Sequence, residues 1–250
     1  MDYYTHDRIG VIDSGIGGLT VVKQIQIKFP EADVVFIGDS ANCPYGNKSK
    51  LQLIELGSKL INICKDFGCN KVILGCNTLS TLIDLFKDND IPVIDIISPV
   101  IEYITANDVR DIGVLGTEAT IASGKYHLPG RVNIELGNKQ LAKYIDDYDL
   151  NFAVPLLNSE IELCRKNNCS TILLGCTHYH IILDEIDHKV LTIIDPASLV
   201  VNKLQVNSVN GSIKVFTTGN LDIYKKVCEY LHIENVEYNK LSEKEKNGFR

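Results

Sequence analysis

The sequence has little positive charge and no long apolar run, and each absence removes a class of function. Its 250 residues include 25 Lys and Arg against 32 Asp and Glu, so the formal net charge is −7. No run of Lys and Arg resembles a footprint for a phosphate backbone, so we expect no nucleic acid partner. No segment approaches the roughly 18 apolar residues of a membrane span, and the N-terminus has no apolar signal core. We therefore expect a cytoplasmic protein that does not bind membranes.

Common metal and nucleotide patterns are missing as well. The chain has eight cysteines, but the pairs Cys64/Cys69 and Cys164/Cys169 lack the C-x₂-C spacing of structural zinc sites. The glycines at 15, 17 and 18 match neither the P-loop nor the dinucleotide fingerprint. We therefore expect no metal and no nucleotide cofactor. Disulfides do not persist in the cytosol, so some cysteines are candidates for thiol chemistry and the others for small buried apolar residues.

Short apolar segments alternate with longer amphipathic ones along the whole chain. Apolar, β-branched runs predict strands at 9–13, 33–38, 71–75, 91–95, 111–116, 131–136, 171–175, 191–195 and 213–219. Helical spacing predicts helices at 17–29, 49–67, 81–88, 158–168 and 221–231. This alternation is typical of mostly parallel sheets flanked by helices, so the predicted fold class is α/β.

The sequence also repeats itself with an offset of about one hundred residues. VILGCNTLS at 72–80 returns as ILLGCTHYH at 172–180, and IPVID at 91–95 returns as LTIID at 191–195. IGVIDSG at 9–15 has an echo in IGVLGTE at 112–118. Two copies of one α/β unit predict two pseudo-symmetric domains.

The loops that follow the strands carry the candidate functional residues. Ligands of open α/β sheets bind at the carboxyl ends of the strands, so we expect the active site at the interface of the two domains. Cys76 and Cys176 would then flank one ligand from opposite sides. Cys76 leads into a helix, whose dipole we expect to lower the thiol pKa from about 8.5.

Two opposed thiols suit racemisation or epimerisation, in which one removes a proton from a stereocentre and the other returns one to the opposite face. A hydrolase pairing Cys176 with His178 is an alternative, although such pairs are usually distant in sequence. Asp13 and Ser14 have a second interpretation as a helix cap.

Five ordered segments resemble those of the cofactor-independent aspartate/glutamate racemase family. They are GVIDSGIGGLTV, FIGDSANCPYG, ILGCNTLS, IGVLGTEATIASGKY and LLGCTHY, and the resemblance spans about residues 9 to 219. It implies an enzyme that interconverts L- and D-glutamate without pyridoxal phosphate or metal and supplies D-glutamate for peptidoglycan. It also allows a homodimer.

The resemblance implies a role for each matching residue. Cys76 and Cys176 would be the two bases, with Asp13 and His178 as polar neighbours that assist proton transfer and contact the substrate. The carboxylates and ammonium of the substrate would be held by Ser14, Tyr45, Gly46, Asn77, Thr78 and Thr177, joined by Thr117 and Thr120. Residues 1–97 with 208–250 would form the first domain and 98–207 the second, and the charged tail from Ser242 would be frayed.

The chain departs from the family pattern around the expected site. In VPLLN at 154–158, Asn158 stands where the family has a Glu near one catalytic cysteine, and Asn42 and Cys43 replace an Arg-Phe pair. Leu79 and His180 are further departures. These changes leave aspartate or another acidic amino acid open as the substrate. A catalytically weak paralogue that binds an amino acid or a protein partner is the alternative of another class, although both cysteines are present.

Overall fold

The structure is a computed structural model that describes residues 6–188, 190–208 and 211–241. The predicted frayed tail from Ser242 lies outside the described residues. Within those ranges, every helix is too short or too polar to cross a lipid bilayer.

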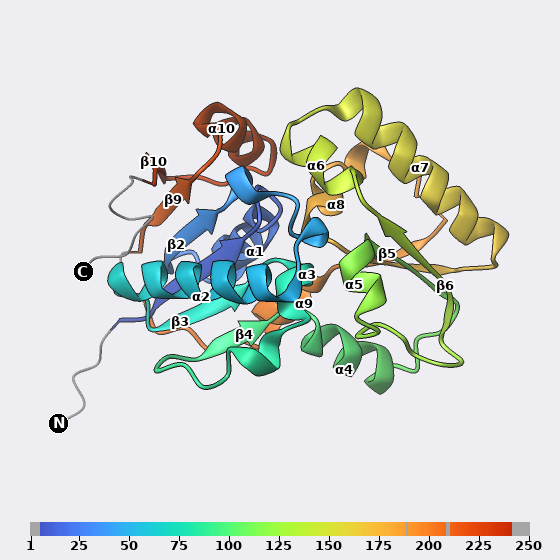
Figure 1. Cartoon of the computed structure of the whole chain (residues 1–250), viewed down its shortest axis with the longest axis horizontal. Coiled ribbons are helices and arrows are strands. Elements are labelled where there is room, and N and C mark those ends of the chain that lie inside the picture. The colour runs from blue at the N-terminus through green and yellow to red at the C-terminus, as the bar shows by residue number, and fades with distance from the viewer. Residues whose placement is uncertain (1–5, 189, 209–210, 242–250) are drawn as a thin grey trace.

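The first sheet takes strands from both ends of the chain (Figure 1). Its order is β10-β9-β2-β1-β3-β4, and all neighbouring strands are parallel. The strands are β1 (Arg8–Asp13), β2 (Asp33–Gly38), β3 (Lys71–Leu74), β4 (Val93–Asp95), β9 (Ile213–Thr217) and β10 (Val236–Lys240). Three longer helices connect them, namely α1 (Leu19–Lys28), α2 (Lys50–Asp66) and α10 (Leu221–Tyr230).

The second sheet has the order β6-β5-β7-β8 and is also parallel throughout. Its strands are β5 (Ile112–Thr117), β6 (Val132–Asn138), β7 (Thr171–Gly175) and β8 (Thr192–Ile194). Around it lie α4 (Ser98–Ala106), α5 (Glu118–Ala122), α6 (Leu141–Asp146), α7 (Leu150–Lys166), α8 (Thr177–Ile181) and α9 (Pro196–Asn202). This strand order repeats β2-β1-β3-β4 of the first sheet. The predicted α/β class with two related parallel sheets is confirmed.

Local sequence explains most element ends and two mistaken predictions. The segment predicted as a helix at 81–88 forms only a 3₁₀ turn, Ile83–Leu85. Asp and Asn side chains follow it and compete for backbone groups, as when Asn89 donates to the carbonyl of Phe86. Helix α7 begins at Leu150, eight residues earlier than predicted, and continues across Pro155. One lost backbone hydrogen bond is tolerated there because the same helix buries Ala153 and Leu157.

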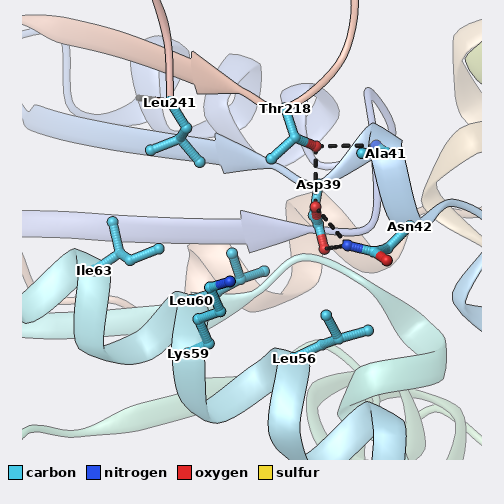
Figure 2. A pocket seen from close by; sticks show the side chains of 9 residues that line it. All are labelled: Asp39, Ala41, Asn42, Leu56, Lys59, Leu60, Ile63, Thr218 and Leu241. Atoms are coloured by element: carbon cyan, nitrogen blue, oxygen red, sulfur yellow. Dashed lines mark hydrogen bonds between the residues drawn. The ribbon is translucent and has the colours of Figure 1, made fainter. Parts of the chain in front are cut away.

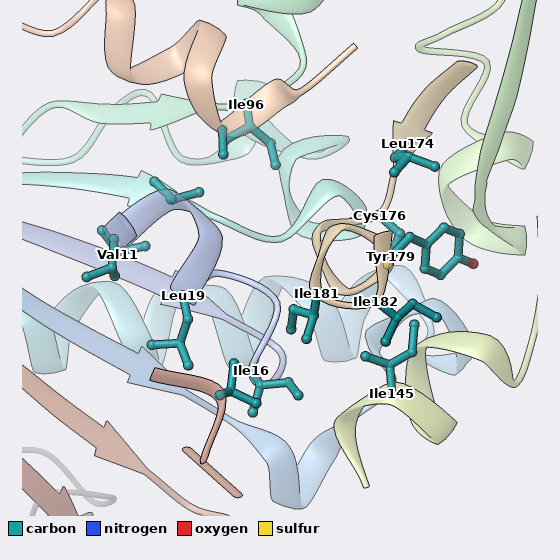
Figure 3. Packing of buried hydrophobic residues seen from close by; sticks show 14 of the residues in the cluster. Val11, Ile16, Leu19, Ile96, Ile145, Leu174, Cys176, Tyr179, Ile181 and Ile182 are labelled. Carbon is teal, nitrogen blue, oxygen red and sulfur yellow. The ribbon is translucent and has the colours of Figure 1, made fainter. Parts of the chain in front are cut away.

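The two halves share one apolar cluster (Figure 3). Ile16 and Leu19 from the first half belong to it together with Ile145, Tyr179 and Ile181 from the second, and all five are at most 2% exposed. Burying such side chains stabilises the contact by roughly 1.5–3 kcal/mol each. The cluster therefore holds the carboxyl ends of β1 and β7 against each other, where the candidate residues lie.

Candidate active site

Cys76 and Cys176 line one pocket from opposite sheets. Cys76 follows β3 and precedes the short helix α3 (Asn77–Ser80), whereas Cys176 follows β7 and precedes α8. Each is 5% exposed. The pocket is narrow, with a cavity volume of about 10 Å³, and is also lined by Ser14, Pro44, Tyr45, Asn77, Thr78, Thr117, Ala142, Thr177 and His178. The sequence repeat thus brings its two cysteines to one cavity.

The predicted lowering of the Cys76 pKa is wrong. Burial raises the pKa of this thiol to about 12, and the nearby carboxylate of Asp13 adds to the rise. Bonds from the Leu79 backbone and from Ser14, whose Oγ lies 3.7 Å from Cys76 Sγ, oppose it. Helix α3 spans only four residues, so its dipole is too small to outweigh desolvation. Cys76 therefore carries its proton at neutral pH.

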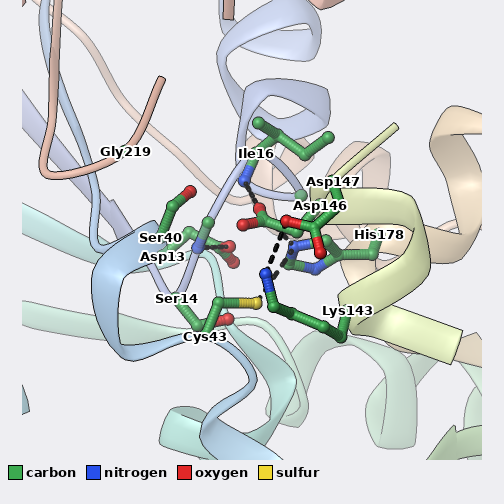
Figure 4. A network of polar contacts seen from close by, with 12 residues as sticks. Asp13, Ser14, Ile16, Ser40, Cys43, Lys143, Asp146, Asp147, His178 and Gly219 are labelled. Atoms are coloured by element: carbon green, nitrogen blue, oxygen red, sulfur yellow. Dashed lines mark hydrogen bonds and ion pairs between the residues drawn. The ribbon is translucent and has the colours of Figure 1, made fainter. Parts of the chain in front are cut away.

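Beside Cys176, His178 forms a buried ion pair with Asp146 (Figure 4). His178 Nε2 lies 3.2 Å from Asp146 Oδ1, and His178 Nδ1 lies 4.0 Å from Cys176 Sγ. Burial disfavours the charged imidazole, but the bond to Asp146, followed by those to Cys176 and Cys43, raises the His178 pKa well above its usual 6.5. Burial also acts against the charge of Asp146, yet His178 lowers the Asp146 pKa. A protonated His178 can donate to both partners.

Asp13 lies behind the pocket wall, next to Thr177. Its side chain is fully buried and accepts hydrogen bonds from the Gly15 backbone at 2.8 Å and from Thr177 Oγ1 at 3.1 Å. Burial raises its pKa, while the charge of His178 lowers it. The alternative helix-cap role is not observed, because α1 begins at Leu19 and has no side-chain cap. Asp13 instead fixes Thr177 next to Cys176.

Hydroxyl and amide groups form the remaining wall. The hydroxyls of Thr78, Thr117 and Thr120 lie 2.9–3.2 Å from one another. Asn77 accepts a hydrogen bond from Tyr126 at 2.6 Å, whereas its buried amide nitrogen has no partner. A buried donor without a partner is costly, so this nitrogen is well placed to bind an acceptor on a ligand.

Tyr45 bonds to Asp39, and Asp39 lines a second pocket (Figure 2). The Tyr45 hydroxyl donates to Asp39 at 2.8 Å, and Asp39 also accepts from Asn42 and Thr218. On the other side of Asp39, a pocket of about 140 Å³ is bounded by apolar residues of α2 and by Leu241. Asp39 thereby holds Tyr45 in place in the active-site wall.

The structure brings the predicted site residues together in two layers. Nine of the twelve line the pocket directly, namely Ser14, Tyr45, Cys76, Asn77, Thr78, Thr117, Cys176, Thr177 and His178. The other three lie behind them. Asp13 bonds Thr177, Thr120 bonds Thr78 and Thr117, and Gly46 packs so closely that an added Cβ would lie 2.7 Å from Thr117 Cβ.

Sequence reasoning missed the carboxylate of Asp146 and named only Asn158, as the residue that stands where the family has a Glu near one catalytic cysteine. Asn158 is half-buried on α7 and does not line the pocket, because the buried face of that helix carries Ala153, Leu157 and Ile161. The short helix α6 packs on α8 instead and presents Asp146 to His178. The only signal in the sequence was the acidic run at 146–149, in which nothing marks the buried residue.

Comparisons with known proteins agree with this geometry. The chain matches the family model for Asp/Glu/Hydantoin racemase over residues 9–204. A glutamate racemase of Persephonella marina is 34% identical and covers 93% of this chain and 98% of its own length. A solved glutamate racemase isoform of Bacillus anthracis has 25% identity and a TM-score of 0.82, covering 96% of this chain and 99% of its own. A glutamate racemase of Francisella tularensis, solved in complex with D-glutamate, has 28% identity and a TM-score of 0.79, covering 94% and 96%.

Racemases thus match nearly all of the chain in both sequence and fold, and the protein is an amino-acid racemase, an isomerase. It belongs to the Asp/Glu/hydantoin racemase family.

Proposed function

We propose that the protein is a glutamate racemase that interconverts L- and D-glutamate by proton transfer between Cα and two cysteines. The observation that carries this proposal is that Cys76 and Cys176 line one pocket from two different sheets. A stereocentre bound between them presents one face to each sulfur. One sulfur removes the Cα proton and the other delivers a proton to the opposite face.

The two sulfurs have different surroundings. Cys76 holds its proton, because burial raises its pKa to about 12, and it is therefore the proton donor in the first half of a cycle. Cys176 is then the base, and the protonated His178, 4.0 Å away, is placed to stabilise negative charge on its sulfur. In the reverse reaction the two cysteines exchange roles.

Neutral donors are proposed to hold the substrate. The free amide nitrogen of Asn77 and the hydroxyls of Ser14 and Thr78 face or line the pocket, and each hydrogen bond to the substrate would contribute about 1 kcal/mol. Thr177 also lines the pocket, but its hydroxyl donates to Asp13, so its oxygen is left as an acceptor. Hydrogen bonds to the α-carboxylate that strengthen as charge develops would lower the barrier to Cα deprotonation. Glutamate as the substrate is supported by the names of the relatives and by the bound D-glutamate in one of them.

The remaining proposals concern the metabolic role of the product, the cofactors and the domain boundaries. We propose that D-glutamate is supplied to peptidoglycan synthesis and that the reaction needs neither pyridoxal phosphate nor metal. Residues 1–97 with 208–250 and residues 98–207 are proposed as the two domains, which is consistent with the strands that each sheet contains. A homodimer and a cytoplasmic location stay predictions of the sequence.

Proton exchange tests the proposal directly. The purified chain is incubated with L- or D-glutamate in D₂O, with a chelator and without pyridoxal phosphate, and Cα deuterium and optical rotation are followed. Exchange with inversion is expected for glutamate. Exchange with aspartate alone would assign a different acidic substrate, and no exchange with any acidic amino acid would leave a weak, ligand-binding paralogue.

Variants test the two-base mechanism. Cys76→Ser and Cys176→Ser are each expected to lower racemisation on the order of 10²–10⁴-fold, because each removes one proton-transferring group. Cys69→Ala and Cys169→Ala are matched controls at the opposite ends of β3 and β7, and they should retain activity. Full racemisation by either serine variant rules out the mechanism.

A further inference from the structure

Three possible metal ligands meet at the edge of the active site, and none has a metal-binding role in the proposed reaction. They are Cys43, Asp146 and His178, whose ligand atoms all lie within 4.8 Å of one another. Cys43 follows the 3₁₀ turn Ser40–Asn42, Asp146 ends α6, and His178 lies in α8, so three separate elements converge (Figure 4).

We propose that this cluster binds zinc and that the bound ion inhibits the enzyme. Thiolate, imidazole and carboxylate together form a donor set that zinc prefers over calcium or magnesium. The inhibition rests on the function proposed above, whereas zinc binding itself does not.

The distances are close to those of a tetrahedral site. Bond lengths of about 2.3 Å to sulfur, about 2.1 Å to nitrogen and about 2.0 Å to oxygen place the sulfur about 3.6 Å from the nitrogen, and the nitrogen about 3.3 Å from the oxygen. The observed separations are 4.0 Å from Cys43 Sγ to His178 Nε2 and 3.2 Å from Nε2 to Asp146 Oδ1. The sulfur therefore needs to move about 0.4 Å closer to the imidazole nitrogen.

The surroundings support a bound cation in two ways. The Ile16 backbone N–H donates to Asp146 Oδ1 at 2.8 Å, which holds the carboxylate in place as outer contacts do in metal sites. A pocket of about 140 Å³ is lined by Ser40, Ala41 and Asp146 among others, so it offers an entry path to one of the three ligands and room for a fourth ligand such as water. The charge of Lys143 opposes the ion, but Lys143 pairs with Asp147.

Zinc at this position changes the chemistry of His178. Binding displaces the thiol proton of Cys43 and the Nε2 proton of His178, and both protons pass to solvent as the metal–sulfur and metal–nitrogen bonds form. The metal then takes the place of the proton between His178 Nε2 and Asp146, and it fixes the position of the ring whose Nδ1 lies 4.0 Å from Cys176 Sγ. Zinc therefore acts as an inhibitor, and a chelator should raise or preserve activity.

The experiment compares the unaltered chain with Cys43→Ser and with the control Cys169→Ala, whose thiol lies at the far end of β7. Cobalt(II) reports binding without any need for activity, because its bond to a thiolate gives a charge-transfer absorption. Zinc is then added to displace cobalt and, separately, to inhibit racemisation. Circular dichroism checks that each variant is folded.

We expect the cobalt–thiolate absorption in the unaltered chain and in Cys169→Ala, and its loss in Cys43→Ser. Loss of the ligand should weaken zinc inhibition at least about tenfold, measured for each variant relative to its own activity without zinc. If Cys43→Ser keeps the cobalt–thiolate absorption or the zinc inhibition unchanged, the metal binds at the catalytic thiols instead. That result would overturn the proposed site. Cobalt binding in a chain that does not racemise glutamate would leave the site intact and refute the proposed function alone.

Discussion

The carboxylate of Asp146 should control the charge of His178. Asp146→Asn removes that negative charge but keeps the side-chain shape and an oxygen that can accept the hydrogen bond from Ile16. The two side chains are each 2% exposed, and His178 Nε2 lies 3.2 Å from Asp146 Oδ1. At an effective dielectric constant of about 20, two unit charges at that distance attract by about 5 kcal/mol. Removing one partner of a buried pair commonly costs about 3–5 kcal/mol of stability, in line with this figure.

Both the pKa of His178 and the rate should therefore fall. Burial disfavours the charged imidazole of His178, and the bond to Asp146 is the largest effect that favours it. Asp146→Asn removes that effect, so the His178 pKa decreases. We expect glutamate racemisation at pH 8 to drop on the order of 100-fold, with partial recovery as the pH is lowered and His178 regains its proton. The measurements are a titration of His178 by NMR, racemisation rates across pH, and urea unfolding.

The neighbouring acid supplies the control. Asp147 is 54% exposed and pairs with Lys143, so Asp147→Asn should change stability by only about 0–1 kcal/mol and leave the His178 titration in place. The reasoning is refuted if His178 titrates in Asp146→Asn as it does in the unaltered chain. A rate loss that is equal at every pH would likewise contradict an electrostatic role.

Two further predictions concern Glu160 and Gly46. Burial raises the pKa of Glu160 from 4.5 to about 7, against a hydrogen bond from Asn138, so the folded chain keeps a proton that the unfolded chain releases. This contribution to stability is complete below about pH 4.5 and lost as the pH rises through 7. Glu160→Gln should therefore be up to about 3 kcal/mol more stable than the unaltered chain at pH 8, as measured by urea unfolding. Equal pH slopes for the two chains would contradict it. Gly46→Ala places a Cβ 2.7 Å from Thr117 Cβ and should displace that hydroxyl, raising KM for glutamate about tenfold; an unchanged KM counts against the role of Thr117.

Sequence alone predicted most of the strands, because each of these is a buried apolar run of β-branched residues. All nine predicted strands are present, and the repeated segment around Cys76 and Cys176 predicted their place at two strand ends. Strand β10 was missed. This strand is only half-buried at its inward positions and carries charged residues, so it has no continuous apolar run.

The family resemblance also identified residues that lie behind the pocket wall. Thr120 and Asp13 are each fully buried and act through Thr78, Thr117 and Thr177, and the motifs alone pointed to them. Resemblance failed where the chain departs from the motif. The short helix α6, which carries Asp146, has no sequence pattern that distinguishes it from a loop. The comparison with the family motif therefore pointed to VPLLN on α7.

The sequence by itself determined the two parallel sheets, the repeat and the two cysteines, since periodicity and motif are local properties of the chain. Only the tertiary structure decided the electrostatics. Burial, which depends on every element packed around a side chain, raises the pKa of Cys76 where a helix N-terminus had predicted a fall. The convergence of Cys43, Asp146 and His178 likewise brings Cys43 to two residues that lie more than one hundred positions further along the chain, and no local pattern records it.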